Sequence, residues 1–108
     1  GTKRVEIDGV TMNTKIRRLV LDVLKPHEPD AIVVATAIAD HAGIDGVNVT
    51  LLETDREVQN LTLTIEGEAI DEAAIEETVN DLGGTVHSID QVVCGDRTVE
   101  RVKTPQDR

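Results

Sequence analysis

Four stretches of this chain alternate apolar and polar residues with a period of two, the spacing that a half-buried β-strand requires. In the first stretch, Leu19, Leu21 and Val23 fall on one face of the predicted strand. The four stretches are residues 15–24, 44–54, 58–66 and 85–94. The alternation breaks near Asp90 and Gln91, which predicts a β-bulge or the end of the last strand. A chain of 108 residues is long enough for one domain with its own core.

Two segments between these strands show helical spacing instead. The first helix is expected over residues 29–41, because Pro29 and Asp30 favour a helix start and Gly43 favours a helix end. Its predicted buried face consists of Ile32, Ala35, Thr36 and Ala39. Residues 25–30 before it contain two prolines, so we expect a loop there.

The second helix carries the clearest local signal in the chain. Asp71 is placed as its N-cap, Ile70 and Ile75 are placed as a hydrophobic staple, and Gly83 ends it. The predicted buried face consists of Ile75, Thr78, Val79 and Leu82. The opposite face is acidic, and we interpret it as a solvated surface formed by Glu72, Glu76, Glu77 and Asp81.

The order strand, helix, strand, strand, helix, strand predicts two right-handed split βαβ units. The strands then form one four-stranded antiparallel sheet, with the last strand beside the first, the first beside the third and the third beside the second. Both helices cover one face of this sheet. The expected fold class is therefore α+β, a ferredoxin-like βαββαβ sandwich. We divide the chain into residues 1–14, an N-terminal extension that can add a strand, residues 15–96, the ferredoxin-like domain, and residues 97–108, a basic tail.

Charge is unevenly distributed along the chain. Acidic residues outnumber basic ones 21 to 11, which gives a net charge of −10. Residues 1–18 carry a charge of +3, residues 97–108 a charge of +2 and residues 19–96 a charge of −15. A negative field repels nucleic acid and anionic membranes, and a chain without aromatic residues has no platform for stacking bases. Arginine exceeds lysine, so we interpret the acidic composition as that of a halophile; an ordinary acidic domain is the alternative.

A single cysteine and the absence of membrane signals set the expected location. Cys94 cannot form an intrachain disulfide, which fits a reducing cytoplasm, and we expect it to be a small buried side chain. No stretch reaches the ~18 apolar residues of a membrane span, and no secretory signal is visible at the start. We therefore expect a cytoplasmic protein that binds neither membrane nor nucleic acid.

Three stretches of the chain resemble a known family. They are IRRLVLDVLKPHEPD, GIDGVNVTLLETDRE and LTLTIEGEAIDEAAIEETVNDLGGTVHSIDQVVCG, and the resemblance runs from Ile16 to about Gly95, nearly the whole predicted core. They are similar to the archaeal domain-of-unknown-function family 211. The resemblance implies an archaeal, ferredoxin-like, oligomeric protein, and it implies no established activity. The chain departs from the family pattern in the eleven residues before Met12 and in its basic tail.

The predicted topology brings several polar residues to one end of the sheet. This end combines the close of the first strand, the loop 25–30, the turn 53–57 and the start of the last strand. Carboxylates and neutral imidazoles are plausible ligands for a divalent cation, the one cofactor that the residues favour. The expected ligands are Asp22, His27, Glu28 and His87. The alternative is a solvated acidic rim, because the chain contains no HExxH or EF-hand motif.

Two functions from different classes remain open on the sequence. The first is a non-enzymatic homo-oligomeric module that binds a small ligand or a divalent cation in a regulatory role. The second is a small enzyme that uses His27 and His87. Ser88 lies beside His87 in sequence, but neighbours on a strand point to opposite faces, which disfavours a nucleophile–base pair. We therefore expect no enzymatic activity.

Self-association has two predicted forms. The topology gathers basic residues at the pole opposite the loop 25–30, namely Lys15, Arg17, Arg18, Arg97 and Arg101. The acidic segments 28–30 and 53–57 lie at the other pole, so contact between unlike poles would close a ring. A back-to-back dimer through the open sheet faces is the alternative. Apolar burial would come from Ile16, Val20 and Leu24, with help from Val5, Ile7 and Val10 of the extension.

Overall fold

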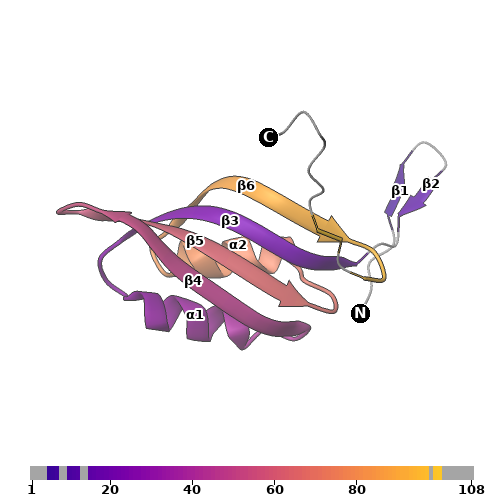
Figure 1. The fold of residues 1–108 in the computed structure, drawn as a ribbon, viewed down its shortest axis with the longest axis horizontal. Coiled ribbons are helices and arrows are strands. Elements are labelled where there is room, and N and C mark those ends of the chain that lie inside the picture. Colours follow the sequence, from indigo (N-terminus) through magenta and orange to yellow (C-terminus); the bar gives the residue numbers. More distant parts are fainter. Residues whose placement is uncertain (1–4, 8–9, 13–14, 98, 101–108) are drawn as a thin grey trace.

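The computed structural model describes residues 5–7, 10–12, 15–97 and 99–100. Its main body contains the elements β3 (Ile16–Pro26), α1 (Ala31–Ala39), β4 (Ile44–Thr54), β5 (Val58–Gly67), α2 (Glu72–Asp81) and β6 (Thr85–Cys94). Four strands form one sheet in the order β4-β5-β3-β6, and every neighbouring pair is antiparallel. Both helices lie on the same face of the sheet (Figure 1). The predicted ferredoxin-like α+β fold and its strand order are confirmed.

The core lies between the sheet and the two helices. Leu19, Leu21 and Val23 of β3 are buried there, as the alternation of the sequence predicts. The remaining core residues come from β5, α1 and α2 and include Leu63, Ile65, Val34, Ile38, Ile75 and Val79. Each fully buried aliphatic side chain contributes about 1.5–3 kcal/mol relative to exposure, so this aliphatic core holds the two layers together without any aromatic residue.

The second helix forms as its sequence predicts. The carboxylate of Asp71 accepts a hydrogen bond from the backbone N–H of Ala74 at 3.2 Å, which satisfies a free donor in the first turn. Ile70 and Ile75 are both buried, so the hydrophobic staple fixes the entry of the chain. Gly83 adopts a φ of 88°, the left-handed conformation that ends the helix at low cost.

The first helix differs from the prediction in its length and in its buried face. It begins at Ala31, with Asp30 as the N-cap that accepts from the N–H of Val33 at 3.1 Å. Its buried residues are Val34 and Ile38, whereas Ile32 is 74% exposed. The predicted face was wrong because the segment AIVVATAIA is apolar on all sides, so spacing alone cannot select the face that packs.

The first strand is longer than predicted, and the last strand contains one bulge more than predicted. The first strand continues through Lys25 and Pro26, which pair with Gln59 and Val58, so the loop begins two residues later than expected. A terminal proline costs the ladder only one donor. The break predicted near residue 90 is confirmed as a bulge, because Val20 pairs with Gln91 and Leu21 with Ile89. A second bulge lies at 87, between the paired residues 86 and 88.

The N-terminal extension forms a separate pair of short strands, β1 (Val5–Ile7) and β2 (Val10–Met12). They pair with each other in antiparallel register and make a two-stranded sheet of their own. In Figure 1 this hairpin stands beside the beginning of β3, away from the helices. We call these residues, Val5–Ile7 and Val10–Met12, the arm. Within the described residues, no helix is long and apolar enough to cross a membrane.

Candidate functional site

The end of the sheet that carries the loop 25–30 is organised by a buried lysine. Lys25 is only 3% exposed, and it continues the row of buried residues on β3. Its ammonium donates to the carbonyl oxygen of Pro26 at 2.6 Å, to that of His27 at 3.4 Å and to Oε1 of Gln59 at 3.0 Å. An ammonium has three donors, and these acceptors use all of them. Lys25 therefore ties the loop to β5.

Burial lowers the pKa of Lys25, because removal from water penalises the charged form; the charges of Glu28 and Asp30 act in the opposite direction. Sequence reasoning missed this residue because it treated residue 25 as the start of a loop. The signal was nevertheless present, since Lys25 falls two positions after Val23 in the period of the buried face. A polar residue that continues the apolar row on one face of a strand is a candidate for a buried, hydrogen-bonded group.

The loop is also joined to the β4–β5 turn. Nε2 of His27 lies 2.6 Å from the carbonyl oxygen of Asp55, so the imidazole donates through this nitrogen. The carboxylate of Asp55 accepts from the N–H groups of Glu57 at 2.9 Å and Val58 at 2.8 Å. These two bonds, first that from Glu57, lower the pKa of Asp55, and the charge of His27 adds to the effect. The loop and the turn thus meet, as the topology predicts.

The four predicted metal ligands are not gathered into one cluster. The Asp22 carboxylate accepts from the side-chain amide of Asn60, which also donates to the carbonyl of Val23 at 3.2 Å. His27 is engaged by Asp55, while Glu28 and His87 are exposed. Across the part of the chain that the structure describes, no three His, Cys, Asp or Glu side chains form a group that could hold a metal ion. A divalent cation at this end stays a prediction.

The open face of the sheet carries an arginine that the sequence assigned to a free basic pole. Nε of Arg18 donates to Glu66 at 2.7 Å, and its terminal nitrogens bind both carboxylate oxygens of Glu100 at 3.0 and 2.7 Å. These two partners, first Glu100, raise the pKa of Arg18, and Arg18 lowers the pKa of Glu100. The Arg18 side chain therefore forms ion pairs within its own chain. Of the other basic residues, Arg17 donates to the carbonyl of Gly95 at 2.7 Å, and Arg101 lies outside the described residues.

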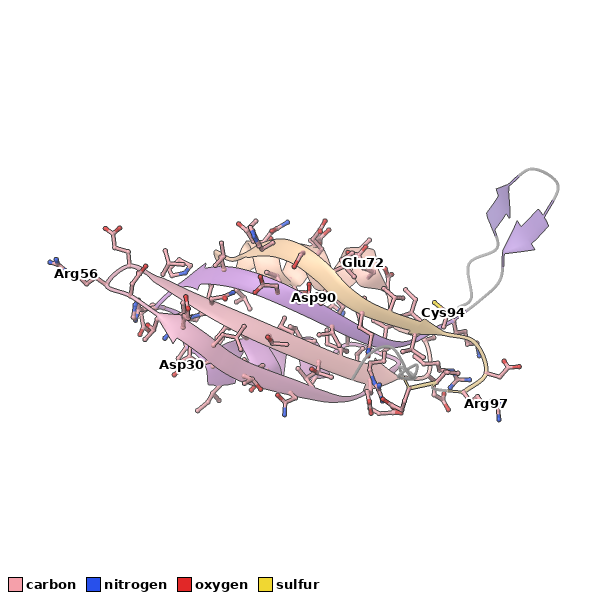
Figure 2. All side chains as sticks on the ribbon, turned by 45° about the horizontal axis from the view of Figure 1, so that its top comes forward. Asp30, Arg56, Glu72, Asp90, Cys94 and Arg97 are labelled. Atoms are coloured by element: carbon pink, nitrogen blue, oxygen red, sulfur yellow. The ribbon has the colours of Figure 1, made fainter. Side chains whose placement is uncertain are left out.

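Two residues of the chain could act as nucleophiles, Ser88 and Cys94. The hydroxyl of Ser88 donates to Oδ1 of Asp90 at 2.7 Å, a carboxylate on the same strand. Cys94 is exposed, so the expectation of a buried thiol was wrong. It is the last residue of β6, an edge strand, where one side of the backbone faces solvent (Figure 2).

An apolar groove lies between the start of α1 and the far part of the β4–β5 hairpin. Its volume is about 300 Å³. It is lined by Asp30, Ala31, Ile32, Leu51, Gln59 and Leu61. Leu61 forms its buried floor, whereas Ile32 is 74% and Leu51 49% exposed on its walls. We call these six residues the α1–β4 groove. Sequence reasoning missed it because it placed Ile32 on the buried face of the first helix.

The fold and these sites define a small two-layer α+β module with a ferredoxin-like topology. The chain belongs to an archaeal protein family described as Uncharacterized ArCR, the domain-of-unknown-function family 211, whose model matches residues 17–108. It is 52% identical over 93 residues to an uncharacterised protein of Methanocaldococcus jannaschii, an alignment that covers 86% of this chain and 96% of that protein. The resemblance seen in the sequence is confirmed, and the arm precedes the matched region. The expected departure of the basic tail from the family pattern was wrong, because residues 97–108 lie within the match.

Proposed function

We propose that this protein is a non-enzymatic, cytoplasmic homo-oligomeric module that binds a small ligand or a divalent cation in a regulatory role. The observation that carries the proposal is the exposed apolar surface on an otherwise acidic body. Ile32 is 74% and Leu51 49% exposed, and both line the groove between the first turn of α1 and the later part of β4. A contiguous apolar patch on a soluble chain is typical of an interaction site.

The alternative of a small enzyme at the His27/His87 end has less support. Nε2 of His27 is bound to a main-chain carbonyl, and the Ser88 hydroxyl is bound to Asp90. A general base must lie within hydrogen-bond reach of the group that it activates. The hydrogen-bonded loop around Lys25 instead gives a fixed frame from which Glu28 and Glu57 project into solvent.

The oligomer is tested by light scattering coupled to size exclusion in 1–2 M KCl. We expect a mass that is a multiple of the chain mass of 11.7 kDa. A ring gives three or more copies, and a back-to-back dimer gives two. A mass of one chain over a tenfold range of protein concentration would contradict self-association.

Cation binding is tested by calorimetric titration with MnCl₂. We expect heat of binding for the unmodified protein and its loss in the double variant His27→Ala/Glu28→Ala. The matched control is Glu76→Ala/Glu77→Ala, which removes exposed acids from α2, an element that supplies none of the predicted ligands. Binding that survives the first double change undiminished would exclude this end of the sheet as the site.

A further inference from the structure

The outer edge of β4 lacks the protection that edge strands usually have. Among the described residues β4 pairs with β5 on one side only, and this pairing is free of bulges from Gly46 to Leu51. An edge strand presents unpaired backbone N–H and C=O groups, which soluble proteins commonly guard with charged side chains or proline. The stretch from Gly46 to Leu52 contains neither, although 30% of the chain is charged. This edge can therefore accept a further strand.

The side chains of this stretch alternate strictly between the two sides of the sheet. Val47, Val49 and Leu51 are apolar and lie on the helix side, because Val47 and Val49 pack on the core and Leu51 lines the α1–β4 groove. Asn48 and Thr50 lie between them and are exposed on the other side. The order is thus apolar, polar, apolar, polar, apolar, which reads the same in both directions.

A strand with such an order matches a second copy of itself. Antiparallel pairing about a two-fold axis at Val49 brings Val47 of one copy opposite Leu51 of the other, and Asn48 opposite Thr50. Every cross-strand pair then joins apolar with apolar or polar with polar. The axis is perpendicular to the sheet, so the helix sides of both copies coincide. A contact of this kind uses the same surface on both copies and closes after two.

The distribution of charge fits the same partner. Each copy carries a net charge of −10, so two copies meet with least repulsion where their surfaces are uncharged, as residues 46–52 are. The other edge strand, β6, does not offer this, because it carries Asp90 at a bulge. In the paired register, Asp45 of one copy comes near Glu53 of the other. Salt screens this repulsion and should therefore strengthen the contact.

The groove beside β4 is covered by the same contact. The helix α1 packs along β4, as Figure 1 shows. Ile32, Thr36 and Ala39 of α1 are exposed and share one side of the helix, since their spacing is i, i+4, i+7. Ile32 lines the groove with Leu51, so this side of α1 borders the outer edge of β4. The two-fold axis brings the two α1 helices together antiparallel, where Thr36 and Ala39 are small enough to leave room for Ile32 of the other copy.

We propose that two copies join through the outer edges of β4, in an antiparallel register centred on Val49, and that each copy covers Ile32 and Leu51 of the other. The two four-stranded sheets then form one continuous sheet with all helices on the same face. This inference rests on the homo-oligomer proposed above, and it specifies a closed pair in place of a ring or a back-to-back dimer. The open face of the sheet, which carries the Arg18–Glu100 ion pair, lies outside the contact.

The first experiment places charges opposite each other across the axis. One full-length variant is Asn48→Asp/Thr50→Asp and another is Asn48→Lys/Thr50→Lys, both at exposed positions. The matched control is Thr85→Asp/His87→Asp, at exposed positions of the other edge strand, β6. Circular dichroism confirms that each variant keeps its fold. Light scattering coupled to size exclusion measures the mass, at the lowest KCl concentration at which the unmodified protein is associated.

We expect the mass of two chains for the unmodified protein and the control. Each charged variant alone should have the mass of one chain, because like charges come to lie opposite each other. An equimolar mixture of the two places Asp opposite Lys and should recover the mass of two chains.

Three results would overturn this inference and leave the proposed oligomer standing. They are an associated mass for either charged variant alone, a mixture that stays at the mass of one chain, and a mass of three or more chains for the unmodified protein. A single-chain mass for the unmodified protein throughout 1–2 M KCl would overturn both proposals.

The second experiment tests the register. The native thiol is removed by Cys94→Ser, and Val49→Cys is introduced in this background. In the proposed pair the two thiols at position 49 face each other with Cβ atoms about 5 Å apart, so oxidation should link the copies. The matched control is Val47→Cys with Cys94→Ser, whose thiols lie about 13 Å apart and should not link.

Equal linking at positions 47 and 49, or no linking at 49, would contradict the register. The helix-side position of Val49 makes this test specific, because a back-to-back dimer through the open faces keeps the two helix sides apart.

Discussion

The two helices cover the same sheet but have opposite outer surfaces. The outer side of α2 is acidic, with Glu76, Glu77 and Asp81 exposed. The outer side of α1 has no charged residue between its caps, and Ile32 and Val33 are exposed there. The helices have similar lengths and equivalent places in the two βαβ units, so position does not explain the difference. A solvated helix tolerates charge at every outward position, and the absence of charge on α1 marks the side of the molecule that the groove occupies.

The largest expected effect separates buried from exposed isoleucines on these helices. Ile75→Ala on α2 should lower the free energy of unfolding by about 2–5 kcal/mol, because the side chain is fully packed. Ile38→Ala on α1 should cost a similar amount. Ile32→Ala should cost less than about 0.5 kcal/mol within a single chain. Urea unfolding measures all three.

Ile32→Ala also has a concentration-dependent signature. If the side chain is covered by a second copy, its loss should matter more at high protein concentration, where the oligomer contributes to stability. Ile38→Ala provides the control, because its effect arises inside one chain. An Ile32→Ala variant that is as destabilised as Ile38→Ala at every concentration would contradict the exposed position of Ile32.

A second test removes the buried ammonium beside the groove. Lys25→Met keeps much of the side-chain volume but leaves the oxygens of Pro26 and Gln59 without their donor. We expect a loss of about 1–3 kcal/mol of unfolding free energy, the usual cost of buried groups left unsatisfied. Lys15 is exposed and lies just before β3, so Lys15→Met should change stability little. Equal effects of the two changes would argue against the role of Lys25.

The pH dependence of stability should also identify Lys25. Because burial lowers its pKa, the unfolded chain binds more protons than the folded chain between the folded value and the unfolded value of about 10.5. The free energy of unfolding should therefore rise with pH in this alkaline window and show no such contribution below it. The chain has no tyrosine to obscure the effect. The difference in unfolding free energy between the unmodified protein and Lys25→Met should therefore rise with pH in this window. A difference that does not change with pH would show that another group causes the rise.

A smaller effect is expected at the two helix caps. Asp71→Ala and Asp30→Ala each remove an oxygen that accepts from a first-turn N–H, and each should cost about 1 kcal/mol. Asp→Asn at the same positions should restore most of the loss, since asparagine also caps. Thermal melts measure the four variants. A larger loss for Asp30→Ala than for Asp71→Ala would reflect the removal of the Asp30 charge, which favours the charged form of Lys25.

The smallest and most general effect is that of salt. The acidic body repels itself, and the Debye length falls from ~10 Å at 0.1 M to ~3 Å at 1 M salt. The melting temperature should therefore rise with KCl, and Glu76→Gln/Glu77→Gln should reduce the gain by removing part of the acidic face of α2. Melts at 0.1 M and 1 M KCl check both statements. A melting temperature that falls with salt would contradict the interpretation of the charge as self-repulsion.

The sequence predicts the sheet better than it predicts the site. Alternation identifies the inward residues of β3, and the staple of Ile70 and Ile75 places α2 correctly. The face of α1 was not predictable, because spacing carries no information when every side chain is apolar. Lys25 was missed because residue 25 was assigned to the loop, although it continues the buried row of β3. Its acceptor Gln59 is distant in sequence and becomes a neighbour only through strand pairing.

The bulges of β6 differ from those of β4 in their spacing, and this difference determines which edge of the sheet can accept a further strand. His87 and Asp90 interrupt β6 so often that its regular runs are only two or three residues long. An irregular outer edge is a poor template for another strand. Strand-by-strand extension of the sheet is therefore open on the β4 side and blocked on the β6 side. A sheet with one regular edge can pair with one neighbour there and leaves no second regular edge for a further strand, so the bulges of β6 limit edge-to-edge association.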